Sequence, residues 1–196
     1  MASQTAAPQL CMQRASLDLL PPLTLPDGYT ARSFQPGDEA AWVRLSDAAF
    51  GDGPHEPAWF YERFHELPFE PRRHWFVCDE NGPVATATAW HRPQWGADTG
   101  YLHWVAADAA HRGRGLGLLV SLAAMHEMVR DGRSSALLQT DDFRIPAVRA
   151  YLTLGYRPRL VHDNQRDRWR SVLAACGRDL AEFEADLAAP LNPPNE

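Results

Sequence analysis

The order of hydrophobic patterns along this sequence predicts an α/β fold, with a β-sheet of mixed strand direction flanked by helices. The patterns follow the order β-α-(α)-β-β-β-α-β-α-β-α between Tyr29 and Phe183. Asn81-Gly82 joins two of the β-patterned runs and is a strong hairpin signal, so those two strands are expected to be antiparallel. Later, a strand, a glycine-rich turn and a helix follow one another, and such helices supply the crossovers between strands.

Composition restricts the class of protein. Hydrophobic residues make up 45% of the 196 positions and charged residues 22%, which is typical of one soluble globular domain with a buried core. The net charge of −6, from 19 basic and 25 acidic residues, disfavours nucleic acid and anionic membranes as partners. The apolar run Leu17–Leu25 is broken by Asp18 and two prolines, so it is neither a membrane span nor a signal peptide. We therefore expect a cytoplasmic protein.

The three cysteines, Cys11, Cys78 and Cys176, are scattered and form no Cys-x-x-Cys pair. This spacing indicates neither a disulfide framework nor a zinc site. For the domain organisation, we expect a poorly patterned arm over residues 1–26, a single domain over residues 27–188 and a tail over residues 189–196. The prolines of the arm suit an extended linker or a strap across the surface, and those of the tail indicate a frayed end.

The first half of the domain is expected to contain one strand, a helix, a short second helix and then three strands. Residues 29–34 alternate loosely as a strand, and Glu39–Ala49 has helical spacing with Asp38 as a candidate cap. The aromatic-rich stretch from Trp59 to His65 suits a short helix that packs its apolar face. The strands that follow are expected at His74–Cys78, Val84–Trp90 and Tyr101–Ala107.

The second half begins with a helix over Leu116–Arg130, which Asp131-Gly132 ends. Its apolar residues recur at three- and four-residue steps and predict one buried stripe, formed by Leu119, Leu122, Ala123, His126 and Val129. His126 is therefore interpreted as a boundary histidine. Beyond this helix we expect a strand at Ala136–Thr140, a helix at Pro146–Leu154 capped by Gly155, a strand at Arg159–His162, and a C-terminal helix from Trp169 that continues through Phe183.

The most informative motif is the turn His111-Arg112-Gly113-Arg114-Gly115-Leu116-Gly117, between a predicted strand and a predicted helix. Such a turn aims backbone N–H groups and a helix N-terminus at an anion. The glycines let the backbone approach a phosphate, and the two arginines add charge. Leu118 stands where a dinucleotide fingerprint has its third glycine or an alanine, and the Gly-Lys-Ser/Thr ending of a P-loop is missing. The alternative is a glycine-rich turn with solvated arginines.

A second motif lies in the segment Asp141–Pro158, where Tyr151 comes shortly before Leu154-Gly155-Tyr156. With Arg112–Gly117 at this separation, the chain resembles the GNAT superfamily of acyl-CoA-dependent N-acetyltransferases. That family carries an Arg/Gln-x-x-Gly-x-Gly/Ala loop for a pyrophosphate, and then a tyrosine before a Leu-Gly-Tyr/Phe ending. The resemblance covers roughly Tyr29 to Leu160.

The resemblance implies a splayed sheet and acetyl-CoA as co-substrate. The strands at Tyr101–Ala107 and Ala136–Thr140 would run parallel and diverge, and the pantetheine arm would enter the gap and pair with strand backbone. The N–H of Val105 would be the oxyanion donor by family position. Arg144 stands where the family has asparagine, and we expect it to reach a phosphate. The implied cofactor-binding residues are Val105, Ala106, Ala107, Arg112, Gly113, Arg114, Gly115, Leu116, Gly117 and Arg144.

The catalytic residues implied by the resemblance are Tyr151 and His103. A phenol with a pKa near ~10 stays protonated and can donate to the departing thiolate; the alternative is a half-buried helix aromatic. His103 is the candidate base; the alternatives are a core histidine, or loss of the amine proton through water. Asp141 and Asp142 either orient an ammonium or cap the following helix. The chemistry calls for no metal.

We therefore expect an acetyltransferase that acts on the amine of a small molecule by direct attack. Two alternatives stay open: an acyl-CoA-binding sensor without turnover, and a protein or peptide N-acetyltransferase. The latter needs an open groove, whereas the many bulky aromatics favour a narrower pocket, of which the stretch from Trp59 to Phe64 could form a wall. The sequence leaves open whether the chain forms a homodimer.

Overall fold

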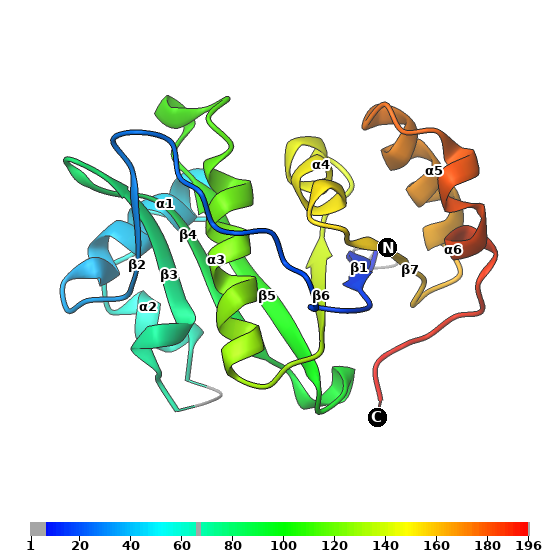
Figure 1. The fold of residues 1–196 in the computed structure, drawn as a ribbon, viewed down its shortest axis with the longest axis horizontal. Coiled ribbons are helices and arrows are strands. Elements are labelled where there is room, and N and C mark those ends of the chain that lie inside the picture. Colours follow the sequence, from blue (N-terminus) through cyan, green and yellow to red (C-terminus); the bar gives the residue numbers. More distant parts are fainter. Residues whose placement is uncertain (1–6, 66–67, 196) are drawn as a thin grey trace, which may run out of the picture.

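The sheet in the computed structural model has seven strands, in the order β2-β3-β4-β5-β6-β1-β7 (Figure 1). The structure describes residues 7–65 and 68–195. The strands are β1 Leu10–Arg14, β2 Thr30–Ser33, β3 His74–Asp79, β4 Gly82–His91, β5 Thr99–Ala107, β6 Ser135–Thr140 and β7 Arg157–Arg159. The helices are α1 Asp38–Phe50, α2 Trp59–Arg63, α3 Leu116–Arg130, α4 Ile145–Thr153, α5 Gln165–Ala175 and α6 Glu184–Ala188. The predicted α/β class with a mixed sheet is confirmed.

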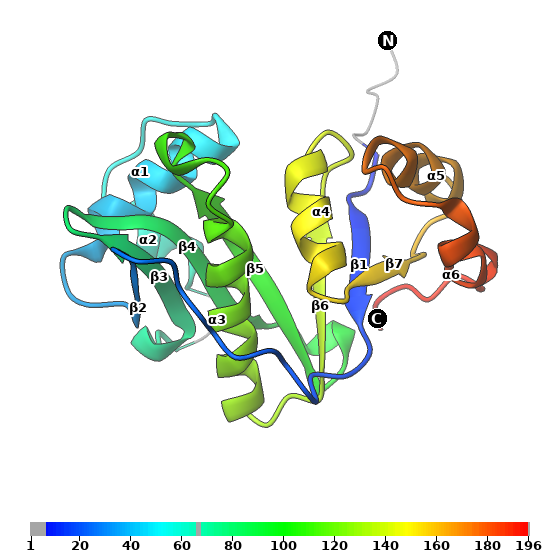
Figure 2. The same cartoon turned by 45° about the horizontal axis from the view of Figure 1, so that its top comes forward.

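The pairing of β5 with β6 is parallel, and every other neighbouring pair is antiparallel. The parallel ladder joins Thr99–Tyr101 to Ser135–Leu137 and stops there. Figure 2 shows the two ribbons meeting at one end and separating toward the other. The predicted splay between these strands is confirmed.

Two apolar clusters hold the helices on opposite faces of the sheet. On one face, α3 to α5 pack onto the strands, and Trp169 and Met125 are among the fully buried side chains. On the other face, Trp42 of α1 and Phe60 of α2 pack against Phe76 of β3. Figure 1 shows α3 in front of the sheet and α1 and α2 behind it. Truncating a fully buried aromatic such as Trp42 costs about 3–5 kcal/mol, so this second cluster contributes substantially to the fold.

The prediction that the arm is an extended linker or a surface strap is wrong for the segment that forms β1. Leu10, Cys11 and Met12 are completely buried, and β1 pairs antiparallel with both β6 and β7. A strand enclosed on both faces has a continuous apolar run rather than an alternating one, so β1 shows no period-2 pattern. Burial also raises the pKa of the Cys11 thiol to about 12. All three cysteines are free and buried.

The remainder of the arm does cross the surface as a strap, as predicted. Residues 15–28 run in front of α3 and lead to β2 (Figure 1). Leu17 N donates to Ser134 O over 2.7 Å, and the Pro21 carbonyl lies 2.9 Å from His126 Nε2. His126 is therefore the boundary histidine that the spacing predicted.

The C-terminal predictions need correction in three places. The last strand is Arg157–Arg159 rather than Arg159–His162. Pro158 lies in its middle, which is tolerated because β7 is an edge strand of the sheet. The predicted continuous helix breaks after α5, and a 3-10 turn, Leu180–Phe183, precedes α6. The tail is not frayed where it is described, because Asn192 N donates to Leu160 O and Asn195 N to Gln94 O.

Two smaller predictions are also corrected. Val129 is 44% exposed, because the buried face of α3 includes Leu116, Val120 and Ala124 rather than the predicted stripe alone. Asp38 is the first residue of α1 and pairs with Arg32 through two bonds of 2.5 and 2.8 Å. Within residues 7–65 and 68–195, none of the helices is long and apolar enough to cross a bilayer.

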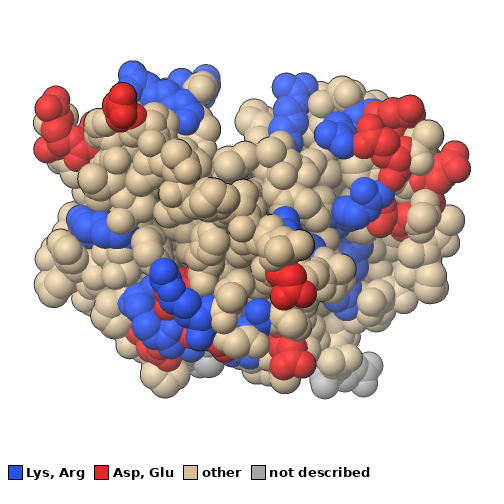
Figure 3. Space-filling view, in the orientation of Figure 1, with Lys and Arg blue, Asp and Glu red and all other residues tan. Residues whose placement is uncertain are grey.

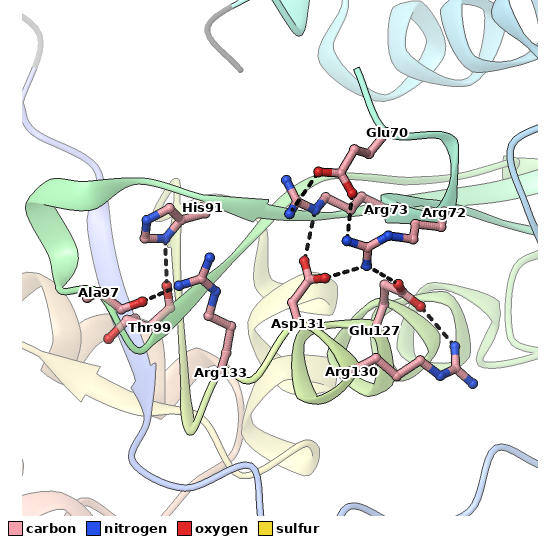
Figure 4. A network of polar contacts seen from close by, with 10 residues as sticks. All are labelled: Glu70, Arg72, Arg73, His91, Ala97, Thr99, Glu127, Arg130, Asp131 and Arg133. Carbon is pink, nitrogen blue, oxygen red and sulfur yellow. Dashed lines mark hydrogen bonds and ion pairs between the residues drawn. The ribbon is translucent and has the colours of Figure 1, made fainter. Parts of the chain in front are cut away.

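A network of ion pairs fixes the C-terminal end of α3 to the turn before β3 (Figure 4). Glu127 accepts from Arg72 and from Arg130 over 2.7 and 2.8 Å. Asp131 accepts from Arg73 Nε over 2.8 Å and also from Arg72. The carboxylate side chains are only 3% and 9% exposed, so water screens these pairs less than it screens surface pairs.

We expect Asp131→Asn to lower the free energy of unfolding by about 1–2 kcal/mol, because the change breaks the ion pairs of a nearly buried carboxylate with Arg72 and Arg73. Urea unfolding measures the difference. Asp167→Asn is the matched control, because Asp167 pairs with Arg170 while its side chain is 93% exposed. Equal stability of Asp131→Asn and the wild type would contradict a stabilising role for the network.

Candidate active site

A cavity of about 260 Å³ lies where β5 and β6 diverge. Its walls come from β5, from the end of β6 and the turn after it, from α4, from the end of α1 and from the residue before β1. The lining residues are Gln9, Phe50, Asp52, Tyr101, Leu102, His103, Trp104, Val105, Gln139, Thr140, Asp141, Arg144, Ala147 and Tyr151. The predicted catalytic pair, His103 and Tyr151, is therefore brought together in one cavity.

A β-bulge shapes the β5 wall of this cavity. Thr88 pairs with His103 and Thr86 with Ala106, so two β5 residues stand opposite Ala87 alone. One of the two is Trp104, whose φ of 49° is rare for a residue with a large side chain. Among the described strands, the other bulge residue, Val105, has no register partner on β4 or β6. This leaves strand backbone exposed to a ligand beside the cavity.

Tyr151 projects from α4 and is 7% exposed. Burial raises its pKa well above the ordinary value for a tyrosine, and the nearby Arg144 guanidinium only partly opposes that rise. Its hydroxyl is thus a proton donor at any physiological pH. The ring of Tyr156 lies 6.1 Å away, centroid to centroid, and lies outside the lining of the cavity.

His103 is half-buried and is one of the β5 residues whose side chains line the cavity. Burial, together with smaller contributions from the charges of Arg92 and His74, lowers its pKa to about 3. The imidazole is therefore neutral at physiological pH, and it can accept a hydrogen bond or donate one.

The two aspartates after β6 have different partners. Asp141 lines the cavity, where it accepts from Arg144 Nε over 2.9 Å and from Gln9 Nε2 over 3.0 Å. Asp142 accepts from Arg168 of α5 over 2.6 and 2.8 Å, and this ion pair lowers its pKa. Neither caps α4, because no side chain bonds to the first turn of that helix.

Arg144 spans the open end of the splay. Besides Asp141, its guanidinium contacts the Ala49 carbonyl over 3.2 Å and lies 4.7 Å from the ring centroid of Phe50. The side chain thus connects the turn before α4 to the end of α1. A phosphate contact by Arg144, which the resemblance implies, would have to compete with these bonds.

The glycine-rich turn leads directly into α3. Gly113 and Gly115 have φ of 83° and 71°, a conformation that favours glycine, and Gly115 is the N-cap residue. The first amide bonded within the helix is that of Leu119, which donates to Gly115 O. The amides of residues 116–118 therefore have no intrahelical acceptor, and no described side chain caps them. This is the geometry that binds an anion.

The basic residues of the turn are exposed. Arg112 forms no side-chain hydrogen bond or ion pair with another residue of the described chain, whereas Arg114 NH1 donates to Tyr29 Oη over 2.5 Å. Figure 3 shows a hollow at one edge of this face, with basic side chains on both sides, over the turn before α3 and over α4. A polyanionic ligand is therefore attracted to this edge.

Sequence reasoning missed several residues of the cavity. Tyr101 donates to Gln139 over 2.9 Å across the splay, and Gln9 reaches Asp141 from the unpredicted strand β1. Asp52 is a single polar residue in a loop, and no motif marks it. Trp59 is outside the lining, and its ring lies 5.5 Å from that of Trp104, so this aromatic stretch supports the cavity wall from behind.

The structure resembles solved acetyltransferases. A GCN5-related N-acetyltransferase from Sphaerobacter thermophilus has a TM-score of 0.61 at 24% identity, over 78% of this chain and 50% of that chain. Another from Kribbella flavida has a TM-score of 0.54 at 22% identity, over 78% and 55%. At these identities the likeness shows a shared fold.

Sequence relatives extend the comparison. A mycothiol acetyltransferase from Thermomonospora curvata is 33% identical over 145 residues, which are 70% of this chain and 47% of that protein. A second, from Thermobispora bispora, is 34% identical over 154 residues, or 74% and 52%. The chain spans about half the length of the curated relatives it matches. Residues 39–156, from the start of α1 to beyond α4, match the family described as Acetyltransferase (GNAT), and the chain belongs to this family.

Proposed function

We propose that this protein transfers an acetyl group from acetyl-CoA to the amine of a small molecule, by direct attack. The observation that carries the proposal is the cavity in the splay, which holds Tyr151 and His103 and lies between β5 and α4. The uncapped N-terminus of α3 supplies an anion site that follows β5 in the chain. The similarity to mycothiol acetyltransferases supports a small-molecule amine as acceptor.

In this proposal, acetyl-CoA lies along the unpaired edge of β5. Its pantetheine amides pair with the backbone of Val105, Ala106 and Ala107, which needs no particular side chain. Its diphosphate faces the turn from Arg112 to Gly117. The end of the β5–β6 ladder after Tyr101 supports this arrangement, because it leaves strand backbone without a neighbouring strand.

The reaction joins the amine nitrogen to the thioester carbonyl carbon. The carbonyl oxygen becomes an oxyanion, for which the Val105 N–H is the proposed donor. When the C–S bond breaks, the C=O bond re-forms and the sulfur takes the proton of the Tyr151 hydroxyl. The attacking nitrogen, which carries a positive charge after attack, releases one proton to water in the cavity, and water returns a proton to the phenolate. Tyr151 is suited to this step because its raised pKa keeps it protonated until the thiolate forms.

His103 is better suited to hold the amine than to deprotonate it. Moving a proton from an alkylammonium with a pKa near ~10.4 to an imidazole with a pKa of about 3 costs roughly 10 kcal/mol. We therefore assign His103 a hydrogen bond to the neutral amine, and water in the cavity carries the ammonium proton away. Asp52 and Asp141 line the same cavity and favour the approach of a cation.

The size of the cavity favours a small acceptor over an extended peptide. A volume of about 260 Å³ lies just below the usual range of small-molecule sites, and Phe50, Tyr101 and Trp104 are among the residues that line it. An acyl-CoA sensor would bind the cofactor without transferring the acetyl group. Release of free thiol from acetyl-CoA, measured with a panel of primary amines, tests the proposal. A rate no higher than that of hydrolysis for every amine would favour the sensor.

We expect Tyr151→Phe to lower turnover about a hundredfold, because the departing thiolate loses its proton donor. The affinity for acetyl-CoA should change less than about twofold, since the lost hydroxyl acts on the transition state. Steady-state kinetics and calorimetric titration with acetyl-CoA measure the two effects.

Tyr156→Phe is the matched control for this variant. The Tyr156 hydroxyl is buried and without a hydrogen-bond partner in the described chain, so its removal should leave turnover unchanged. Full turnover in Tyr151→Phe, under conditions in which the chemical step limits the rate, would rule out the acid role.

We expect the His103 imidazole to show no titration between pH 8 and pH 5 in NMR spectra, with His103→Gln identifying its signal. Since its folded-state pKa is below the unfolded value of about 6.5, the unfolded state binds the proton first. Its contribution to stability is thus present above about pH 6.5 and declines as the pH falls toward 3. A midpoint near pH 6.5 would contradict this assignment and restore His103 as a candidate base.

A further inference from the structure

The turn that precedes α3 is held by a chain of polar contacts from outside the turn. Tyr29 stands at the end of the strap, and its hydroxyl oxygen lies 2.7 Å from His111 Nδ1. The same hydroxyl accepts from Arg114 NH1 over 2.5 Å. His111 Nε2 lies 3.5 Å from Asp79 Oδ2, at the end of β3. One proton arrangement satisfies the chain, in which the Tyr29 O–H donates to Nδ1 and the Nε2–H faces Asp79.

The ring of Tyr29 reinforces these hydrogen bonds. It meets the His111 ring edge to face, with centroids 5.8 Å apart and planes at 82°. The Arg114 guanidinium lies 5.8 Å from the Tyr29 ring centroid, within the range of a cation–π contact. Tyr29 therefore contacts the turn at two places, before Gly113 and after it.

A turn of this composition needs such support. Gly113 and Gly115 restrict the backbone less than other residues would, and the segment from Arg112 to Gly115 is exposed. Ordering a flexible segment when a ligand binds reduces affinity, so a turn that is already ordered binds more tightly. The contacts with Tyr29 remove part of that cost before the ligand arrives.

We propose that Tyr29 is a positioning residue that holds the turn from Arg112 to Gly117 in the conformation that binds the cofactor diphosphate. This inference rests on the proposed function. It also separates the two arginines of the turn. Arg114 is engaged by Tyr29 and holds the turn in place, whereas the side chain of Arg112 is left to meet a phosphate.

The test uses Tyr29→Phe, which keeps the ring and its contacts with His111 and Arg114 but removes the hydroxyl that joins these two side chains. Calorimetric titration with coenzyme A should show a Kd about tenfold higher than that of the wild type. Pantetheine lacks the diphosphate, so its Kd should be unchanged in the same variant. Tyr61→Phe is the control, because the Tyr61 hydroxyl bonds to Glu39 of α1 and does not contact the turn.

Each outcome decides a separate point. An unchanged Kd for coenzyme A in Tyr29→Phe overturns the inference, and so does an equal weakening of coenzyme A and pantetheine. A wild-type protein that binds no coenzyme A would instead overturn the proposed function. Thermal unfolding of Tyr29→Phe checks that the fold is retained.

A double-mutant cycle tests the separation of the two arginines. Because Tyr29 and Arg114 act as one unit, the effects of Tyr29→Phe and Arg114→Ala on the Kd for coenzyme A should not add. Tyr29→Phe and Arg112→Ala should be additive, because they remove a positioning contact and a phosphate contact. The opposite pattern would show that Arg114 binds the phosphate and that Tyr29 does not act through it.

Discussion

The short parallel ladder between β5 and β6, which has only three residue pairs, determines how the sheet opens. β5 and β6 share a parallel ladder from Thr99 to Tyr101, and beyond it each strand relies on its other neighbour. β4 supports β5, and β1 supports β6 over the whole length of β1. The divergence is therefore stable without a ligand, because only the facing edges lose their hydrogen bonds. Because this ladder is short, the facing edges of β5 and β6 are free and a cavity lies between them. Across the open end, Arg144 connects the turn before α4 to α1.

Local signals predicted much of the fold. The bounds of α3 agree fully with the prediction, because a glycine-rich turn begins the helix and Asp131-Gly132 ends it. The hairpin between β3 and β4 also depends on adjacent residues. β1 escaped prediction because its partners lie near residues 140 and 158 and its apolar run is only three residues long. Pairing between distant segments leaves little trace in a single sequence.

The candidate site was predictable in its residues more than in its contacts. The two motifs and the resemblance brought together His103, Tyr151 and the turn before α3. The bulge at Trp104 could not be seen, since it depends on the register between β4 and β5. The hydrogen bonds of Arg144 to Asp141 and to the Ala49 carbonyl were also hidden. Ala49 lies on α1, far from Arg144 in the sequence. The structure, and not the sequence, therefore separates side chains that already bond to other residues, such as Arg144, from side chains without such bonds in the described chain, such as Arg112.

The electrostatics of the site separate a neutral centre from a charged rim. Burial keeps Tyr151 protonated and His103 unprotonated. The arginines before α3 are exposed, and the side chains of the Asp141–Arg144 pair are more exposed than Tyr151. In the proposed reaction a neutral amine and a thioester yield an amide and a thiol, so net charge does not change and a poorly hydrated centre suits the reaction. The same burial would raise the pKa of a departing thiol along with that of Tyr151. If both pKa values rise together, their difference stays close to the ordinary one of about 1.5 units between a phenol and a thiol. The phenol can then protonate the thiolate even though its own pKa is raised.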